Sequence, residues 1–287
     1  MIRLVHPFPS LLNATASAGI AALAGGDPVT SVRLFLAMLG IQVAIGALND
    51  VVDVPHDTVS KPRKPIVAGL VSRRTGLAMA GGGAVVGLAL SAVSGLGTLL
   101  VAAACVALGW LYDLRLSRTW LSWLPLALAL PLLPIHAWLG AAGSVPPSLV
   151  LLVPVGVLAG AGLAIANGLV DVDRDAASGR SPIAVALGQR RGWVLHAALL
   201  ASAAALAVLF APAPRPNAAA PGAAMGTTLM ELRRWGIVVG SVLLAVGAIV
   251  QGSARAGIRE RGWELEAVGV LGLGIGWLAG AAALTRV

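Results

Sequence analysis

Nine stretches of this sequence, each close to 20 residues long, consist almost entirely of apolar residues. An α-helix needs about 20 such residues to cross the hydrocarbon core of a bilayer, and a β-barrel strand would alternate apolar and polar residues instead. We therefore predict an all-α membrane protein, a bundle of about nine transmembrane helices. The predicted spans lie near residues 8–25, 31–50, 74–93, 95–112, 120–141, 147–168, 192–211, 235–252 and 265–284.

The composition agrees with lipid as the main solvent. Hydrophobic residues make up 58% of the 287 positions and charged residues 11%, which leaves too little polar surface for a soluble domain of this size. No soluble domain fits between the spans, so we expect a single transmembrane domain over residues 1–287. The longest gap, Ala211–Arg234, is rich in Pro, Ala and Gly and is expected to form a flexible loop.

The charged residues are distributed unevenly between the two sides that nine spans define. The side of the N-terminus would carry 15 of the 20 Lys and Arg residues and ten of the twelve acidic residues. By the positive-inside rule that side is cytoplasmic, and the C-terminus lies on the opposite side. We interpret the first run as an uncleaved span, because removing it as a signal peptide would disturb this distribution. The net charge of +8 therefore indicates topology, and no nucleic-acid partner is expected.

Two segments match when the sequence is shifted along itself by 118 residues. Asn49, Asp53 and Asp57 in the first segment correspond to Asn167, Asp171 and Asp175 in the second, and Asp50 adds a further carboxylate to the first. Basic residues and a proline follow both segments, as Arg63-Lys64-Pro65 and Arg180-Ser181-Pro182. We interpret the match as an internal duplication, with a first half at residues 1–118 and a second at 119–287.

The spacing of the acids has a chemical meaning. At 100° per residue, Asn49, Asp53 and Asp57 lie at about 0°, 40° and 80° around a helix, so the acids of each segment share one face, whereas Asp173 points elsewhere. Carboxylates at the end of a membrane span are costly unless they meet cations. Oxygen ligands with room for phosphate suit Mg²⁺, and the neighbouring bases would neutralise phosphate oxygens. The alternative is that the acids only pair with nearby Lys and Arg.

The run from Asn49 to Asp57, with Lys61-Pro62-Arg63-Lys64-Pro65 after it, resembles the first signature of the UbiA-type intramembrane prenyltransferases. Asp171-x-x-x-Asp175, followed by Gly179-Arg180, resembles their second. The resemblance covers nearly the whole chain and implies a nine-helix bundle, an isoprenoid diphosphate bridged by two Mg²⁺ ions, and transfer of the prenyl group to an acceptor, often aromatic. Tyr112 also matches many relatives, but Leu116 and Ser117 occupy the positions where those relatives have a base.

Both the spacing of the acids and the family resemblance contribute to the predicted site. The predicted metal ligands, which are also the predicted catalytic residues, are Asp50, Asp53, Asp57, Asp171 and Asp175. The predicted substrate-binding residues are Asn49, Lys61, Arg63, Lys64, Tyr112, Arg115, Arg118, Asn167 and Arg180.

The predicted function is Mg²⁺-dependent transfer of a prenyl group from an isoprenoid diphosphate to an acceptor, an aromatic quinone-type precursor, within the membrane. Two alternatives within the resemblance are a cyclase of the prenyl chain and a transferase of phosphoribosyl to a polyprenyl phosphate. An alternative of a different class is a cation transporter, which would carry its acids near the midplane of broken helices. Beyond the diphosphate, the acceptor and membrane lipid, we infer no obligate protein partner.

Overall fold

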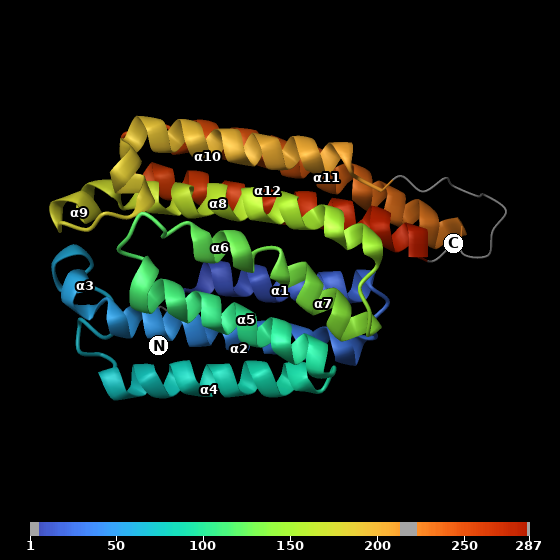
Figure 1. The fold of residues 1–287 in the computed structure, drawn as a ribbon, viewed down its shortest axis with the longest axis horizontal. Coiled ribbons are helices and arrows are strands. Elements are labelled where there is room, and N and C mark those ends of the chain that lie inside the picture. The colour runs from blue at the N-terminus through green and yellow to red at the C-terminus, as the bar shows by residue number, and fades with distance from the viewer. Residues whose placement is uncertain (1–5, 213–222, 286–287) are drawn as a thin grey trace. The chain divides into compact units, whose positions relative to one another are not determined.

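The computed structural model describes residues 6–212 and 223–285, and within those ranges the only regular elements are helices. The chain divides into two compact units, each assembled from separate stretches of sequence (Figure 1). The first unit comprises Met1–Pro125, Leu132–Val145 and Asp173–Pro182. The second unit comprises Leu126–Pro131, Pro146–Val172 and Ile183–Val287.

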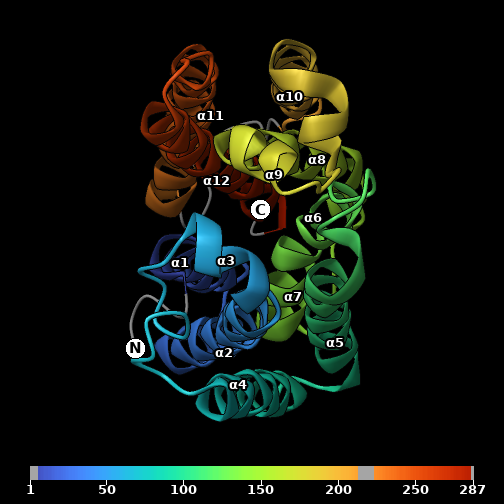
Figure 2. The ribbon, with the colours of Figure 1, turned by 90° about the vertical axis from the view of Figure 1, so that its left-hand side faces the viewer.

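The first unit is built around α2. This long helix packs against α1 and α4, which lie on its two sides, and also against α5 and α7 (Figure 2). A short helix, α3, follows α2 at the end of the unit where α2 finishes (Figure 1). The elements are α1 (Pro7–Leu23), α2 (Pro28–Val52), α3 (Val54–Ser60), α4 (Arg73–Ala92), α5 (Leu96–Leu111), η2 (Tyr112–Leu116), α7 (Leu132–Ala142) and most of α9 (Val172–Ala177).

Local sequence explains where α2 and α4 begin and how closely they approach. The Asp27 carboxylate accepts a hydrogen bond from the Thr30 N–H at 2.6 Å, and Ser72 caps α4 in the same way. Gly40 on α2 faces α4, where a Cβ would come within 2.9 Å of the Gly83 carbonyl oxygen. Small residues at this crossing let the two backbones approach closely, as in other membrane helix pairs.

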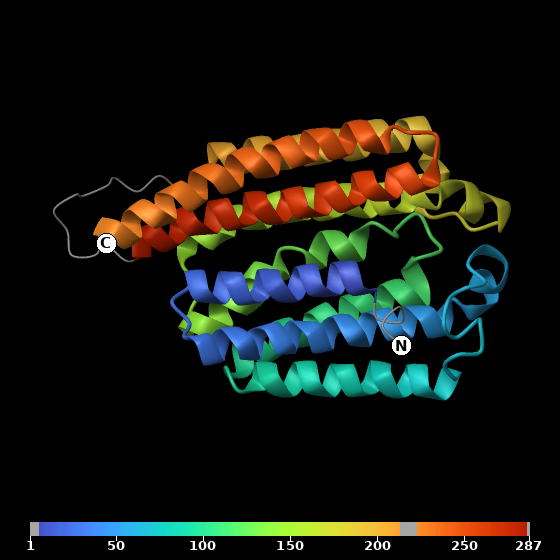
Figure 3. The same ribbon diagram turned by 180° about the vertical axis from the view of Figure 1, so that it is seen from behind.

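The second unit contains three long helices and the paired η3 and α8. The helices α11 and α12 run side by side as an antiparallel hairpin, and α8 packs against α10 and α12 (Figure 3). A short helix, α6 (Leu124–Ala129), crosses the boundary between the units in sequence. The elements of this unit are η3 (Pro147–Leu151), α8 (Leu152–Val170), α10 (Ile183–Leu209), α11 (Ala223–Gln251) and α12 (Ala256–Thr285).

The predicted all-α membrane fold is confirmed, with nine as an approximate count. Among the described residues, eight helical segments are long and apolar enough to cross a membrane, with α6 and α7 forming one of them and η3 and α8 another. The first predicted span appears as α1, which has 17 residues and is therefore slightly short. Large apolar side chains such as Val85, Leu100 and Ile249 are exposed along these helices, as lipid contact requires.

The last three predicted spans begin too late. The structure starts α10 at Ile183, α11 at Ala223 and α12 at Ala256, each at least nine residues before the apolar run. The residues between these helix starts and the apolar runs include Arg190, Glu231 and Arg259, so a search for apolar runs does not detect them. The predicted loop at Ala211–Arg234 is consequently wrong from Ala223 onward, and its residues 213–222 lie outside the described part of the chain.

Candidate functional site

The first acidic segment lies where α2 ends and α3 begins. Asp53 closes α2 and starts α3, and the hydrogen bonds from Asp53 N–H to the Asn49 carbonyl and from Asp57 N–H to the Asp53 carbonyl, at 2.9 and 2.8 Å, keep the turns continuous. Pro55 falls in the first turn of α3, where its missing N–H costs no helical hydrogen bond. The predicted helical spacing of the acids is therefore preserved through the junction.

Lys64 links two acids of this segment. Its Nζ lies 2.6 Å from Asp50 Oδ1 and 2.7 Å from Asp57 Oδ2, and both carboxylates are about 2% exposed. His6 Nε2 approaches the same Asp50 oxygen at 3.3 Å. Burial alone would lower the pKa of Lys64, but its hydrogen bonds to Asp50 and Asp57 outweigh burial and hold that pKa above its usual value. Lys64 therefore stays protonated between two buried carboxylates.

The second acidic segment contributes to the same unit. Arg180 Nη2 lies 2.9 Å from Asp53 Oδ1, and His56 Nε2 lies 3.5 Å from Asp175 Oδ1. These two pairs join α3 to the segment after α8, although Asp53 and Arg180 are 127 residues apart in the sequence. Arg118 also approaches Asp53, at 3.9 Å, from an exposed position. The structure therefore brings together residues from both predicted motifs.

The electrostatics around this cluster reflect burial as well as pairing. Burial raises the pKa of the Asp175 carboxyl, against the opposing effects of Arg180 and His56. Burial and the neighbouring Arg180 lower the pKa of His56. Burial and the nearby Lys64 lower the pKa of Lys61. The cluster is thus partly desolvated, which strengthens the electrostatic interactions among its side chains.

Asp113 is a buried acid that the sequence reasoning missed. It lies in the short π-helix η2, beside the predicted Tyr112, and is 2% exposed. Its Oδ1 accepts a hydrogen bond at 3.0 Å from the amide nitrogen of Asn49, which also approaches Asp53 Oδ2 at 3.4 Å. The only signal in the sequence is one acid near the end of an apolar run. His56 was likewise not predicted as a site residue.

Two predicted residues, Asn167 and Asp171, belong to the second unit. They lie at the end of α8, where Asp171 is the residue that closes the helix. The Gln251 amide donates to the Ala166 carbonyl at 2.6 Å, and the buried Arg259 guanidinium donates to the Val170 carbonyl at 3.4 Å. A cation beside the last carbonyls of a helix is favourable, so these side chains hold the end of α8 in place.

Other predicted residues are less enclosed. Arg63, Arg115 and Arg118 are exposed, and Lys61 is intermediate. Asp173, predicted to point away from its neighbours, is exposed. Within the described ranges, no three His, Cys, Asp or Glu side chains are grouped as a ready metal site. The carboxylates nevertheless offer the hard oxygen donors that Mg²⁺ prefers, with phosphate oxygens able to complete its coordination, so the donor chemistry fits this ion.

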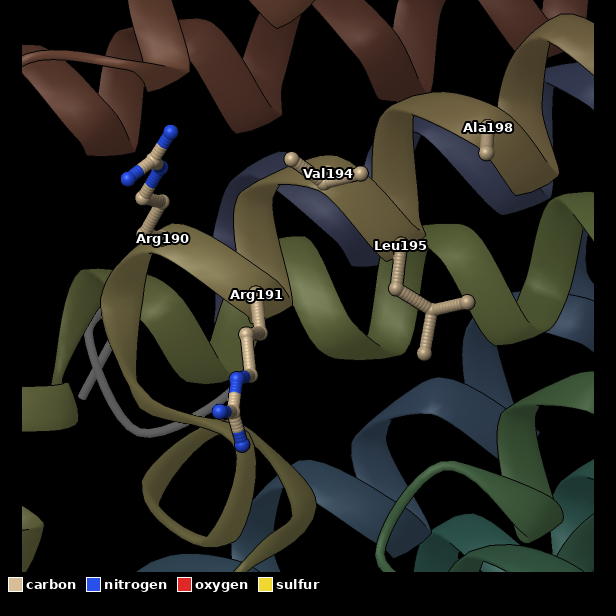
Figure 4. A pocket seen from close by; sticks show the side chains of 5 residues that line it. All are labelled: Arg190, Arg191, Val194, Leu195 and Ala198. Carbon is tan, nitrogen blue, oxygen red and sulfur yellow. The ribbon is translucent and has the colours of Figure 1, made fainter.

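Two further polar features lie away from the acidic segments. In the second unit, His196 Nε2 and Glu266 Oε1 lie 3.0 Å apart, and both side chains are fully buried. Glu266 lies well inside α12, whereas the predicted span of residues 265–284 placed it at the edge. An open groove of about 430 Å³ runs along α10, with Arg190 and Arg191 at one end and apolar side chains beyond them (Figure 4). It lacks carboxylates, and so it does not offer the same chemistry.

The sequence was also compared with known proteins. A model of the UbiA prenyltransferase family matches residues 10–251. The digeranylgeranylglyceryl phosphate synthase of Metallosphaera sedula is 38% identical over 76 residues, which span 26% of this chain and only 27% of that relative.

Solved structures share the fold. A UbiA homolog from Archaeoglobus fulgidus bound to GPP and Mg²⁺ has a TM-score of 0.71 at 16% identity, covering 98% of this chain and 99% of that one. The apo UbiA homolog from Aeropyrum pernix K1 has a TM-score of 0.65 at 19% identity, covering 96% of this chain and 97% of that one. These likenesses extend over both compact units.

Proposed function

Because the chain belongs to the UbiA prenyltransferase family, we propose that it transfers a prenyl group from a Mg²⁺-bound isoprenoid diphosphate to a small acceptor within the membrane. The observation that carries this proposal is the meeting of both acidic segments in the first unit. Asp53 with Arg180, and His56 with Asp175, join residues far apart in the sequence. Pairing for topology alone would need only neighbouring charges.

The acids supply oxygen ligands in this proposal. Two Mg²⁺ ions would be held by Asp50, Asp53, Asp57, Asp171 and Asp175. The ions, when bound, neutralise the diphosphate and so make it a better leaving group. The salt bridges from Lys64 to Asp50 and from Arg180 to Asp53 support this assignment, because they place cationic side chains directly against the carboxylates. When a diphosphate arrives, the same bases are close enough to transfer their hydrogen bonds to phosphate oxygens.

The remaining side chains are assigned to substrate binding. Asn49 and Asn167 orient ligands beside the acids, and the basic residues Lys61, Arg63, Lys64, Arg115, Arg118 and Arg180 bind the diphosphate. Tyr112 lies near the acids, next to Asp113, and would contact the prenyl diphosphate or anchor the helix end. An apolar pocket around the prenyl chain would exclude water, which would otherwise capture the allylic cation as the C–O bond breaks.

The acceptor is proposed to be an aromatic quinone precursor. A second candidate is a prenylated glyceryl phosphate, which is favoured by the 38% identity with the Metallosphaera sedula synthase over 76 residues. A phosphate-bearing acceptor would need more cations than an aromatic one, and in that case the exposed Arg115 and Arg118 would bind the acceptor instead of the diphosphate. Reactions with both acceptor classes distinguish the two candidates.

The first test of this function uses the purified protein with Mg²⁺, labelled prenyl diphosphates of several lengths, and pools of aromatic and glyceryl phosphate acceptors. We expect diphosphate release and a prenylated product, both abolished by EDTA. Asp53→Ala and Asp171→Ala are each expected to reduce the rate by at least about 100-fold, because each removes charge stabilisation at the leaving group.

Asp173→Ala is the matched control, since Asp173 belongs to the same acidic segment but is exposed. It should retain most of the activity. Full activity in Asp53→Ala or Asp171→Ala would refute the use of both acidic segments. Flux of cations through reconstituted liposomes, without diphosphate cleavage, would favour a transporter instead.

A further inference from the structure

The Asn49 side chain has only one orientation that fits its neighbours. Its two contacts are carboxylate oxygens, Asp113 Oδ1 at 3.0 Å and Asp53 Oδ2 at 3.4 Å. An ionised carboxylate accepts hydrogen bonds and donates none, so the atom of the amide that faces both must be its nitrogen. The Asn49 side-chain carbonyl oxygen is therefore the atom of the amide that does not face these two acids.

Asp113 lies in a π-helical turn. The Ser117 N–H donates to the Tyr112 carbonyl at 2.8 Å, five residues back, so the turn holds one residue more than an α-helical turn. One added residue rotates the following side chains by about 100° around the helix axis. Here Asp113 is buried, whereas the next two residues, Leu114 and Arg115, are exposed. Such turns often occur at functional sites.

The contact with Asn49 is the hydrogen bond that orients the Asp113 carboxylate. Asp113 Oδ2 is buried and has no hydrogen-bond partner among the described residues. The carboxylate is therefore oriented through Oδ1, which accepts the Asn49 amide N–H at 3.0 Å. Asn49 and Asp113 thus fix each other's orientation.

We propose that Asp113 is a positioning residue, which fixes the Asn49 amide so that Asn49 offers its carbonyl oxygen to the metal–diphosphate complex. This inference rests on the proposed function, because it concerns the same site. Asp113 itself acts through Asn49. In metal sites, residues that orient a ligand typically alter metal affinity by about 10–100-fold when they are replaced.

Two polar substitutions that differ in reach test this role. Asp113→Asn retains a carbonyl oxygen at the same distance and can still accept from Asn49. Asp113→Ser is also polar but too short to reach Asn49. The measurement is Mn²⁺ affinity by electron paramagnetic resonance, in the presence of a non-hydrolysable prenyl thiolodiphosphate.

We expect Asp113→Asn to stay within about threefold of the unmodified protein and Asp113→Ser to lose about tenfold or more in Mn²⁺ affinity. Adding Asp113→Ser to Asn49→Ala should cost little beyond Asn49→Ala alone, because both changes remove the same interaction. Equal affinities for Asp113→Asn and Asp113→Ser, or additive losses in the double variant, would overturn the proposal. An unmodified protein that neither binds Mn²⁺ nor releases diphosphate would instead refute the proposed function.

Discussion

Lys64 is the residue on which the first acidic segment most depends. Its ammonium lies within 2.7 Å of both Asp50 and Asp57, and all three side chains are largely removed from solvent. Breaking a buried ion pair by removing one partner typically costs about 3–5 kcal/mol, because the other charge stays buried without compensation. Here one cation compensates two acids, so removing it should lower the stability of the folded protein markedly.

We predict that Lys64→Met lowers the thermal stability of the metal-free protein in detergent, by about 3–5 kcal/mol in the free energy of unfolding. Mg²⁺ should restore more stability to this variant than to the unmodified protein, since the ion replaces the missing positive charge. Arg63→Met is the matched control, because the Arg63 side chain is adjacent to Lys64 in the sequence but is exposed. Equal stability of the two variants without metal would contradict the prediction.

For individual residues, the sequence predicted which residues belong to the site better than it predicted which of them are in contact. The repeat of Asn, Asp and basic residues indicated Asp53 and Arg180 as members of one site, and the structure places them in contact. Their roles in metal and substrate binding are predictions. Asp113 has no counterpart in the repeat, and its importance depends on a π-helical turn and on a contact with Asn49, 64 residues away. No local pattern in the sequence encodes such a contact.

Among the helices, α11 and α12 show most clearly how small residues determine packing. A Cβ on Gly276 would lie 2.7 Å from the Ile237 backbone nitrogen, whereas a Cβ on Gly274 would meet no atom within 4 Å. A side chain at position 276 would therefore force the two backbones apart, whereas one at position 274 would not. Because lipid provides little hydrophobic drive for helix association, such close contact is a main source of stability.

We predict that Gly276→Ala lowers the free energy of unfolding by about 1–3 kcal/mol, as overpacking does in tightly packed interiors. Gly274→Ala, two residues away on the same helix, should be neutral or slightly stabilising, because alanine is the better helix former. Thermal unfolding in detergent measures both. A similar loss in the two variants would argue against close packing of α11 on α12.

The helices were also predictable to different degrees. Apolar length identified the spans, and among the described residues eight helical segments are long and apolar enough to cross a membrane. The beginnings of α10, α11 and α12, which include charged side chains, were missed, since helix formation there depends on packing and continuity rather than on apolar length. Gly188 interrupts α10 with φ of +72°, a conformation that favours glycine, and the polar residues Gln189, Arg190 and Arg191 follow directly after this kink.

For the whole molecule, the charge distribution predicts the orientation in the membrane. His6 lies 3.3 Å from Asp50, so the N-terminal end of α1 and the first acidic segment occupy the same end of the first unit. We propose that this end is cytoplasmic, because it carries most of the Lys and Arg residues. The C-terminus is proposed to lie on the opposite side.

Two single-cysteine variants test this orientation. In a Cys105→Ala background, we expect Ser178→Cys to react with a membrane-impermeant maleimide only after cells are permeabilised. Ser144→Cys, in the connection between α7 and η3, should react in intact cells. Both serines are exposed, so accessibility within the protein is matched. The reverse labelling pattern would contradict the proposed orientation.

The pairing of Asp53 with Arg180 also constrains how the protein is made. Lys64 leaves the ribosome shortly after Asp50 and Asp57, but Arg180 follows Asp53 by 127 residues. At about 5–20 residues per second, translation leaves Asp53 without that partner for roughly ten seconds. During this interval several apolar helices of the nascent chain enter the membrane. Asp53 must therefore stay hydrated at the membrane surface, and the site is completed only when the segment after α8 emerges.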